Sequence, residues 1–309
     1  MLRIVSLIVF LFMPLSAVQA QVVVTIKPLH SLALAVMEGS GEEPLLLVDG
    51  KASLHEFTLR PSQAKALRTA HAVVYMGDEF EPFLEKILPQ LPTDVKRLAM
   101  EESPGMMLYP VRVGVGFETH EHHDGHEHHD AHQHENHDLH AWMSPTNARA
   151  MVKEMARAFS EISPAHAALF KRNADALDKK LSALDAGLQK RMEALKGKPF
   201  VVFHDAYQYF DRAYDLKNIG SITLHPEQGL SARRVSELRK KIKRSGAVCV
   251  FREPEFEGKI VENLMQGTNT KTATLDPEGA LLEPGVELYF QLMEGIATQL
   301  EACLNRPAA

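Results

Sequence analysis

Short apolar runs rich in β-branched residues alternate with segments of helical periodicity through the first hundred residues. The run QVVVTIKP, for example, is followed by LHSLALAVMEG, in which apolar positions recur every three or four residues until Gly39 ends the pattern. The pattern predicts strands over residues 21–28, 43–50, 71–77 and 94–100, and helices over 29–39, 60–70 and 81–88. Strands that alternate with helices favour a parallel sheet with helices on its faces.

The same alternation returns in the last third of the chain. It predicts strands over residues 198–205, 216–222, 247–254 and 270–277, and helices over 231–246, 257–267 and 285–304. A further helix is predicted to begin at Pro145, capped by Ser144, and to run to about residue 160. The fold class is therefore predicted as α/β, with two units that each contain a mostly parallel sheet.

A single long amphipathic helix is predicted between the two α/β units. Its apolar positions are spaced by three and four residues, and they are Phe170, Ala174, Leu177, Leu181, Leu184, Leu188, Met192 and Leu195. Pro164 begins the helix and Gly197 ends it, which gives a rod of roughly 45 Å. A coiled-coil dimer and a strut between two lobes both fit this pattern, and the flanking α/β units favour the strut. The predicted organisation is an N-terminal lobe (21–163), a linking helix (164–197) and a C-terminal lobe (198–309).

The first twenty residues have the pattern of an export signal. Arg3 precedes an apolar run over residues 4–13, and small residues at positions 18 and 20 suit a signal peptidase. Ten apolar residues are too few to span a hydrocarbon core of about 30 Å. We therefore interpret residues 1–20 as a cleaved secretory signal and expect the mature chain to be exported.

Charge and cysteine content narrow the picture further. The formal net charge is −6 and no basic stripe occurs, which argues against nucleic acid as a partner. The two cysteines, Cys249 and Cys303, are expected to form a disulfide in an oxidising compartment, and two buried free thiols are the alternative. A bridge would fasten the last predicted helix to a strand of the C-terminal lobe.

Ten of the sixteen histidines lie between His120 and His140, with seven acidic residues among them or just before them. Residues 118–138 contain too little apolar surface to fold, so we expect a disordered histidine-rich loop within the N-terminal lobe. Its imidazoles could bind several zinc ions weakly. An accessory role in concentrating or sensing metal is the favoured interpretation, and a solvated insertion without a role is the alternative.

Four residues are candidate metal ligands because of their context. His55 lies between a predicted strand and a predicted helix, His140 lies just before a capped helix, and His204 and Asp276 end predicted strands. Ligands of open α/β sheets gather at the carboxyl ends of strands. Three imidazoles with a carboxylate or water form a good tetrahedral zinc site, whereas calcium and magnesium prefer oxygen ligands.

Each candidate also has an ordinary structural explanation. A lone histidine is more often a surface or hydrogen-bonded core residue, and we assign His30, His71, His166 and His225 to that class. Asp276 precedes Pro277 and could simply form a turn.

Several segments, in order along the chain, resemble the ZnuA type of metal-binding component found in bacterial metal ABC importers. They are HEFTLRPSQ, the histidine-rich loop that runs into HAWMSP, FHDAYQYF, REPEF and LDPEG. The resemblance implies two α/β lobes joined by one long rigid helix, with a metal cleft between the lobes. It also implies that His55, His140 and His204 hold the ion. Manganese-type members carry a carboxylate in place of His204, so imidazole there favours zinc.

The chain departs from the resemblance at one position. Some zinc-binding members have a glutamate directly before the first histidine, and this chain has Leu54, which cannot donate. The fourth ligand would then be water or Asp276, because Glu56 would point away from the site in an extended segment. Trp142, the only tryptophan, lies two residues after His140 and should report on the site.

The resemblance implies a function as well as a fold. We expect a periplasmic monomer that captures Zn²⁺ as a transported ligand and delivers it to the membrane permease of an ABC importer. A binding protein for manganese or another divalent metal, and a periplasmic zinc buffer or chaperone, are the alternatives. An exported three-histidine zinc enzyme is less favoured, because the sequence contains no nucleophile elbow and no HExxH helix.

Overall fold

A computed structural model describes residues 21–49, 57–112, 117, 137–223, 232–254, 256, 259–265 and 270–305. The predicted signal segment (1–20), His55 with its neighbours Leu54 and Glu56, His225, and residues 118–136 of the histidine-rich loop lie outside these ranges. Among the helices that the structure describes, none is both long enough and apolar enough to cross a bilayer.

The first sheet contains four parallel strands in the order β2-β1-β3-β4. These strands are β1 (Val22–Val24), β2 (Leu45–Leu46), β3 (Ala72–Tyr75) and β4 (Lys96–Ala99). Every residue of β1 and β3 is buried, as expected for central strands covered on both faces. The prediction of a parallel sheet in this part of the chain is confirmed.

The second sheet repeats this arrangement with the order β6-β5-β7-β8, again entirely parallel. Its strands are β5 (Phe200–Val202), β6 (Asn218–Ser221), β7 (Cys249–Arg252) and β8 (Lys271–Thr274). We call the first sheet with α1 (Lys27–Met37), α2 (Pro61–Thr69) and α3 (Pro145–Ile162) the first lobe. The second sheet with α5 (Gln208–Tyr214), α6 (Ala232–Ser245) and α7 (Lys259–Met265) is the second lobe.

Two elements differ from the prediction. The segment 81–88 forms two short 3₁₀ turns, Pro82–Leu84 and Leu88–Gln90, instead of one helix. Pro89 explains this difference, because a proline lacks the N–H of a continuing α-helix and disfavours helical backbone at the residue before it. Helix α5 was not predicted, since it has only seven residues and most of them are buried.

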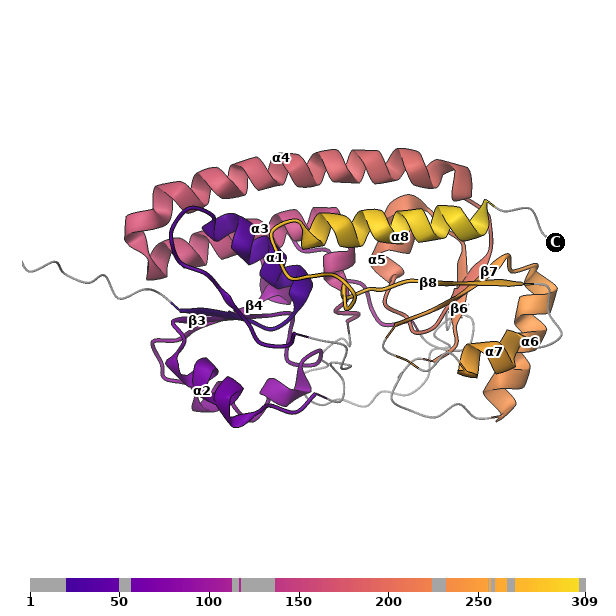
Figure 1. The fold of residues 1–309 in the computed structure, drawn as a ribbon, viewed down its shortest axis with the longest axis horizontal. Coiled ribbons are helices and arrows are strands. Elements are labelled where there is room, and N and C mark those ends of the chain that lie inside the picture. The colour runs from indigo at the N-terminus through magenta and orange to yellow at the C-terminus, as the bar shows by residue number, and fades with distance from the viewer. Residues whose placement is uncertain are drawn as a thin grey trace, which may run out of the picture.

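The long linking helix is confirmed. Helix α4 (Ala167–Met192) is extended by 3₁₀ turns at Pro164–His166 and Glu193–Leu195. Its predicted apolar stripe is buried along its whole length and packs on α1, α3 and α8. Figure 1 shows α4 running over both lobes, so it acts as a strut between them.

A second crossing joins the lobes at the C-terminal end of the chain. After β8 the chain returns to the first lobe, where the Lys27 ammonium donates to the carbonyls of Gly279, Ala280 and Leu282. Helix α8 (Leu288–Leu304) then runs back along α4 toward the second lobe (Figure 1) and contacts α1, α4 and β8. The expected disulfide between Cys249 of β7 and Cys303 of α8 is present.

Candidate metal centre

Two of the four predicted ligands meet at the junction of the lobes. His204 lies two residues beyond β5, and His140 caps the 3₁₀ helix Ala141–Met143 that leads into α3. Their Nε2 atoms are 3.3 Å apart, and both side chains are buried. The sequence places these histidines 64 residues apart, so tertiary folding alone brings them together.

Each histidine is oriented by a buried carboxylate at its other ring nitrogen. Asp138 Oδ1 lies 2.8 Å from His140 Nδ1, and Glu253 Oε2 lies 2.5 Å from His204 Nδ1. A carboxylate can only accept, so each Nδ1 carries the proton and donates it. The two Nε2 atoms therefore face each other, and either one shared proton or a metal ion can join them, which is the arrangement that metal-binding histidines require.

Asp138 is held in place by both lobes. It also accepts from the backbone N–H of His140 and, through Oδ2, from Gln208 Nε2 of α5 at 3.1 Å. The Tyr209 hydroxyl, also on α5, donates to the Asp138 carbonyl. Burial disfavours the ionised carboxylate, but the hydrogen bonds and charge of His140 outweigh it, so the pKa of Asp138 is lowered.

Residues 137 and 138 were predicted to end the disordered loop, but they belong to the folded structure. His137 forms an antiparallel bridge with Pro110, and Asp138 is buried with the partners described above. The folded structure therefore includes His137 and Asp138, because the Asp138 carboxylate organises the turn that carries His140.

Glu253 reaches His204 from the neighbouring strand of the same sheet. It follows β7 directly and is 2% exposed, and it also accepts from the Tyr207 hydroxyl. Burial disfavours the His204 imidazolium, but the charge of Glu253 and its hydrogen bond outweigh that effect and raise the pKa of His204 to about 9. At neutral pH a proton on His204 Nε2 can then be shared with His140 Nε2, in the position where a metal ion would bind both.

Aromatic rings form one wall of the candidate metal centre. The ring centroids of Phe80 and Trp142 lie 5.2 and 5.3 Å from that of His140. Trp142 is fully buried and donates through Nε1 to the carbonyl of Pro277 at 2.9 Å. This apolar wall limits water access, and the position of Trp142 supports its use as a fluorescent reporter of the site.

Asp276, the fourth candidate, shapes the loop that follows β8. Its Oδ1 accepts from the N–H groups of Glu278 and Ala280 at 3.2 and 3.0 Å, and its Oδ2 accepts from Leu281 at 3.1 Å. The turn-forming role considered from sequence is thus present. Trp142 binds the adjacent Pro277 carbonyl, so the Asp276 loop is fastened to the same wall as His140.

The remaining described histidines have structural roles. The His30 Nε2 is hydrogen-bonded to the Pro44 carbonyl at 2.9 Å, and burial lowers its pKa. His71 Nδ1 accepts from the Gln21 N–H, and His166 Nδ1 is paired with the Ser163 hydroxyl. Within the described ranges, which leave out His55, no group of three or more metal-ligating side chains occurs.

Sequence reasoning missed Asp138 and Glu253 as functional residues. Asp138 lies at the end of the histidine-rich loop and Glu253 lies in the REPEF motif, but neither residue was assigned a role. A histidine two residues from an aspartate was a usable signal for Asp138. No local signal could identify Glu253, because its partner lies 49 residues away on another strand.

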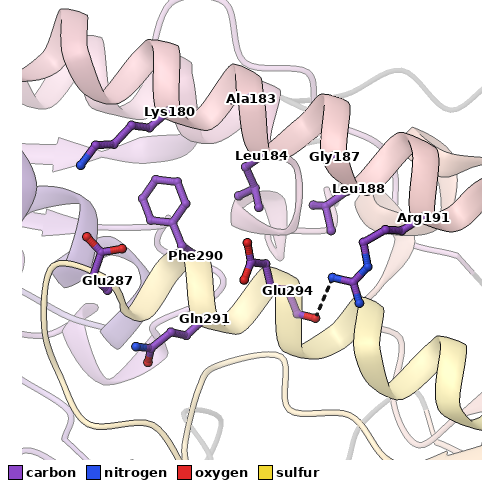
Figure 2. Close-up of a pocket in the computed structure, with 10 residues that line it drawn as sticks. All are labelled: Lys180, Ala183, Leu184, Gly187, Leu188, Arg191, Glu287, Phe290, Gln291 and Glu294. Atoms are coloured by element: carbon purple, nitrogen blue, oxygen red, sulfur yellow. Dashed lines mark hydrogen bonds between the residues drawn. The ribbon is translucent and has the colours of Figure 1, made fainter.

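A surface groove of about 570 Å³ lies elsewhere, between α4 and α8. Figure 2 shows it lined by leucines of α4, by Phe290, and by charged side chains such as Glu287 and Arg191. The Arg191 guanidinium donates to the carbonyl of Glu294 across this groove and forms an ion pair with Glu301 at 2.8 Å. None of its lining residues belongs to the candidate metal centre.

Two parallel sheets spanned by one long helix, with buried histidines that meet at the junction, define a two-lobed solute-binding protein. A family model described as zinc-uptake complex component A, periplasmic (ZnuA), matches residues 22–303. The chain belongs to this family, as the sequence motifs indicated.

Individual relatives agree with the family assignment. The high-affinity zinc uptake system protein ZnuA of Brucella suis is 40% identical over 92% of this chain and 92% of its own. The protein of the same name from Yersinia pestis is 30% identical over 94% and 93%. A crystal structure of ZnuA has a TM-score of 0.73 at 23% identity and covers 91% of this chain and 99% of its own. FpvC of P. aeruginosa, solved with Ni²⁺, has a TM-score of 0.75 at 17% identity, over 93% and 97%. At these identities the two structures show the shared fold alone.

Proposed function

We propose that this protein captures zinc in the periplasm and delivers it to the membrane permease of an ABC importer. The observation that carries the proposal is the 3.3 Å approach of the two Nε2 atoms, each backed by a carboxylate on Nδ1. Membership of the periplasmic zinc-uptake family supports both the ion and the compartment.

Zinc binding would replace a shared proton with a metal ion. The Nε2 lone pairs of His140 and His204 form two bonds to zinc, and Asp138 and Glu253 remain at Nδ1 to balance the added charge. His55, which lies outside the described residues, is proposed as the third ligand. Asp276 or water is proposed as the fourth, since a carboxylate oxygen that accepts one N–H retains a second lone pair.

Imidazole ligands favour zinc over the main alternative ion. Manganese prefers carboxylate, carbonyl and water oxygens, whereas imidazole nitrogen suits zinc. Two buried imidazoles at the site therefore support zinc import over manganese import. We propose that the chain acts as a monomer, that residues 1–20 are removed on export, and that the histidine-rich loop is an accessory rather than the main site.

The decisive test is zinc titration of the purified mature chain in competition with a chelator. We expect one tight site in the wild type, and we expect its loss in the His140→Ala, His204→Ala and His55→Ala variants. A variant that lacks residues 118–136, cut short of Asp138, should retain tight binding. Loss of tight binding on trimming, with the His204→Ala variant unaffected, would place the main site on the loop and overturn the proposal.

A second experiment separates import from buffering and from catalysis. A strain without its own zinc-binding component should grow in zinc-poor medium when it expresses the wild type, and His204→Ala should fail to support growth. Equal growth with both proteins would contradict the import function. Zinc-dependent hydrolysis of ester or peptide substrates, lost in His204→Ala, would support the enzyme alternative instead.

A further inference from the structure

Arg112 forms a buried ion cluster with two aspartates of the second lobe. Its Nε donates to Asp205 Oδ2 at 2.8 Å, and its Nη2 donates to Asp205 Oδ1 and to Asp211 Oδ2, the latter at 3.1 Å. The side chains of the arginine and the two aspartates are 14%, 11% and 5% exposed. The arginine is separated from its partners by more than ninety residues, so the cluster joins distant segments.

The cluster connects the two halves of the metal centre. Asp205 directly follows His204, so the guanidinium fork grips the backbone turn that carries this histidine. Arg112 lies three residues after Tyr109, whose carbonyl accepts from the N–H of Asp138 at 2.8 Å. Arg112 is therefore connected to His204 through Asp205. It is connected to His140 through the Tyr109 carbonyl and Asp138.

Further hydrogen bonds make this connection rigid. Gln208 donates to the carbonyl of Pro110, two residues before Arg112, and to the carboxylate of Asp138. The Tyr209 hydroxyl accepts from the backbone N–H of Tyr109. Asp211 is also fixed by Asn218, whose Nδ2 donates to it at 2.9 Å.

Buried ion pairs add little to stability compared with apolar packing, because both charges lose their water. Their better-supported role is to impose one arrangement on the groups that they join. A planar guanidinium that binds one carboxylate through two N–H groups imposes such an arrangement more strictly than an ammonium can. The Arg112 cluster has this geometry, and it connects the segment that carries His204 to the segment that holds His140 in place.

We infer that Arg112, through Asp205 and Asp211, is a positioning residue that sets the spacing of His140 and His204 and thereby controls how long zinc is retained. This inference rests on the proposed function and goes beyond it by assigning a role to residues that do not touch the ion. Arg112 acts on zinc only through the histidines that it holds in register.

The test compares Arg112→Gln and Arg112→Lys with the control Arg149→Gln. Arg149 binds Asp178 with the same two-pronged geometry, at 2.9 and 3.1 Å, but joins α3 to α4 away from the histidines. Three quantities are measured for each variant: the zinc Kd by chelator competition, the zinc dissociation rate from Trp142 fluorescence, and the Tm of the metal-free protein. Circular dichroism checks folding, and Arg112→Lys keeps the charge should Arg112→Gln fail to fold.

We expect both Arg112 variants to raise the Kd and the dissociation rate by about 10-fold or more, as is typical when groups that orient metal ligands are removed. Arg149→Gln should change both quantities by less than about 2-fold. In the double variant with Asp205→Asn, the effect of Arg112→Gln should largely disappear, because the two side chains act together.

A folded Arg112→Lys variant with a lower Tm but unchanged Kd and dissociation rate would reduce the cluster to a structural role and overturn the inference. That outcome differs from failure of the proposed function, in which the wild type itself shows no tight site, or His204→Ala leaves zinc binding intact. The His204→Ala measurement therefore belongs in the same series.

Discussion

The two histidine–carboxylate pairs look alike at the metal centre but are built differently. His204 and Glu253 follow β5 and β7, which are adjacent strands of one sheet with Phe200 paired to Cys249. His140 and Asp138 share a single turn, and α5 of the second lobe supports Asp138 from outside through Gln208. The His204 pair is thus fixed by sheet register, whereas the His140 pair depends on contact between the lobes.

This difference teaches that the pair of His204 and Glu253 can form within the second lobe alone, whereas the pair of His140 and Asp138 requires contact between the lobes. Parallel strand pairing places residues at the strand ends at fixed separations, so Glu253 meets His204 whenever the second sheet folds. The His140 turn has no such frame and takes its position from the lobe junction. Perturbations should therefore affect the two halves in different ways.

The largest expected effect is the loss of a ligand. His204→Ala should weaken zinc binding by well over about 100-fold, since removal of an orienting partner alone typically costs 10–100-fold. It also leaves the buried Glu253 without its imidazole partner, so the metal-free protein should lose stability. His140→Ala should match it in zinc affinity but destabilise the metal-free protein less, because Asp138 keeps a 3.1 Å hydrogen bond from Gln208 whereas the Tyr207 hydroxyl lies 3.4 Å from Glu253. Chelator competition and thermal unfolding measure the two effects, and equal Tm losses would contradict the contrast.

The orienting carboxylates come next. Glu253→Gln and Asp138→Asn should each weaken zinc affinity by about 10- to 100-fold, because the amide no longer fixes the Nδ1–H form or balances the charge of the ion. Of these two variants, only Asp138→Asn should also increase proteolysis at the lobe junction, because Asp138 contacts α5 of the second lobe whereas the partners of Glu253 lie in its own lobe. Isothermal titration and limited proteolysis of the metal-free protein test the pair. Identical proteolysis of both variants would remove the distinction.

The pH dependence of zinc affinity should be determined by the pair formed by His204 and Glu253. Because Glu253 raises the pKa of His204 to about 9, zinc must displace a proton from His204 at any pH below that value. Zinc affinity should therefore fall by about tenfold for each pH unit between 8.5 and 6.5. In Glu253→Gln the pKa returns toward its ordinary value, so the affinity should be nearly constant above about pH 7. Titrations at four pH values decide this, and a flat wild-type profile would count against the role of Glu253.

The smallest expected effect isolates the contact between the lobes. Gln208→Ala removes the hydrogen bonds to Asp138 and to the Pro110 carbonyl while leaving both histidines and both carboxylates, so zinc affinity should fall only a few-fold. Its effect should largely disappear in an Asp138→Ala background, where residue 138 has no side-chain acceptor for Gln208, but add fully to Glu253→Gln. A double-mutant cycle on zinc affinity measures this, and coupling to Glu253 instead would show that the halves are not independent.

Most of the fold could be predicted from sequence because its signals are local. Both parallel sheets, the linking helix and the Ser144 cap follow from periodicity and capping residues within single segments. The short helix α5 and the 3₁₀ turns around Pro89 were missed or misassigned, since segments of three to seven residues carry little periodicity.

The candidate metal centre was only partly predictable for a related reason. His140 and His204 could be proposed because each lies beside a predicted structural element and within a family motif. Glu253 and Arg112 could not, because their roles depend on partners 49 and more than ninety residues away. Such pairings are set by strand order and lobe packing, and a single sequence does not display either.

The return of the chain along α8 has a consequence for release. Three stretches of chain connect the lobes, namely α4, the segment that Lys27 holds before α8, and α8 itself, and the disulfide fastens the end of α8 to β7. Lobes that are connected by several segments in this way cannot separate by a large rotation about a single hinge. Release of the ion at the membrane would then require local movement of the turns that carry the ligands, while the relative orientation of the two lobes stays fixed.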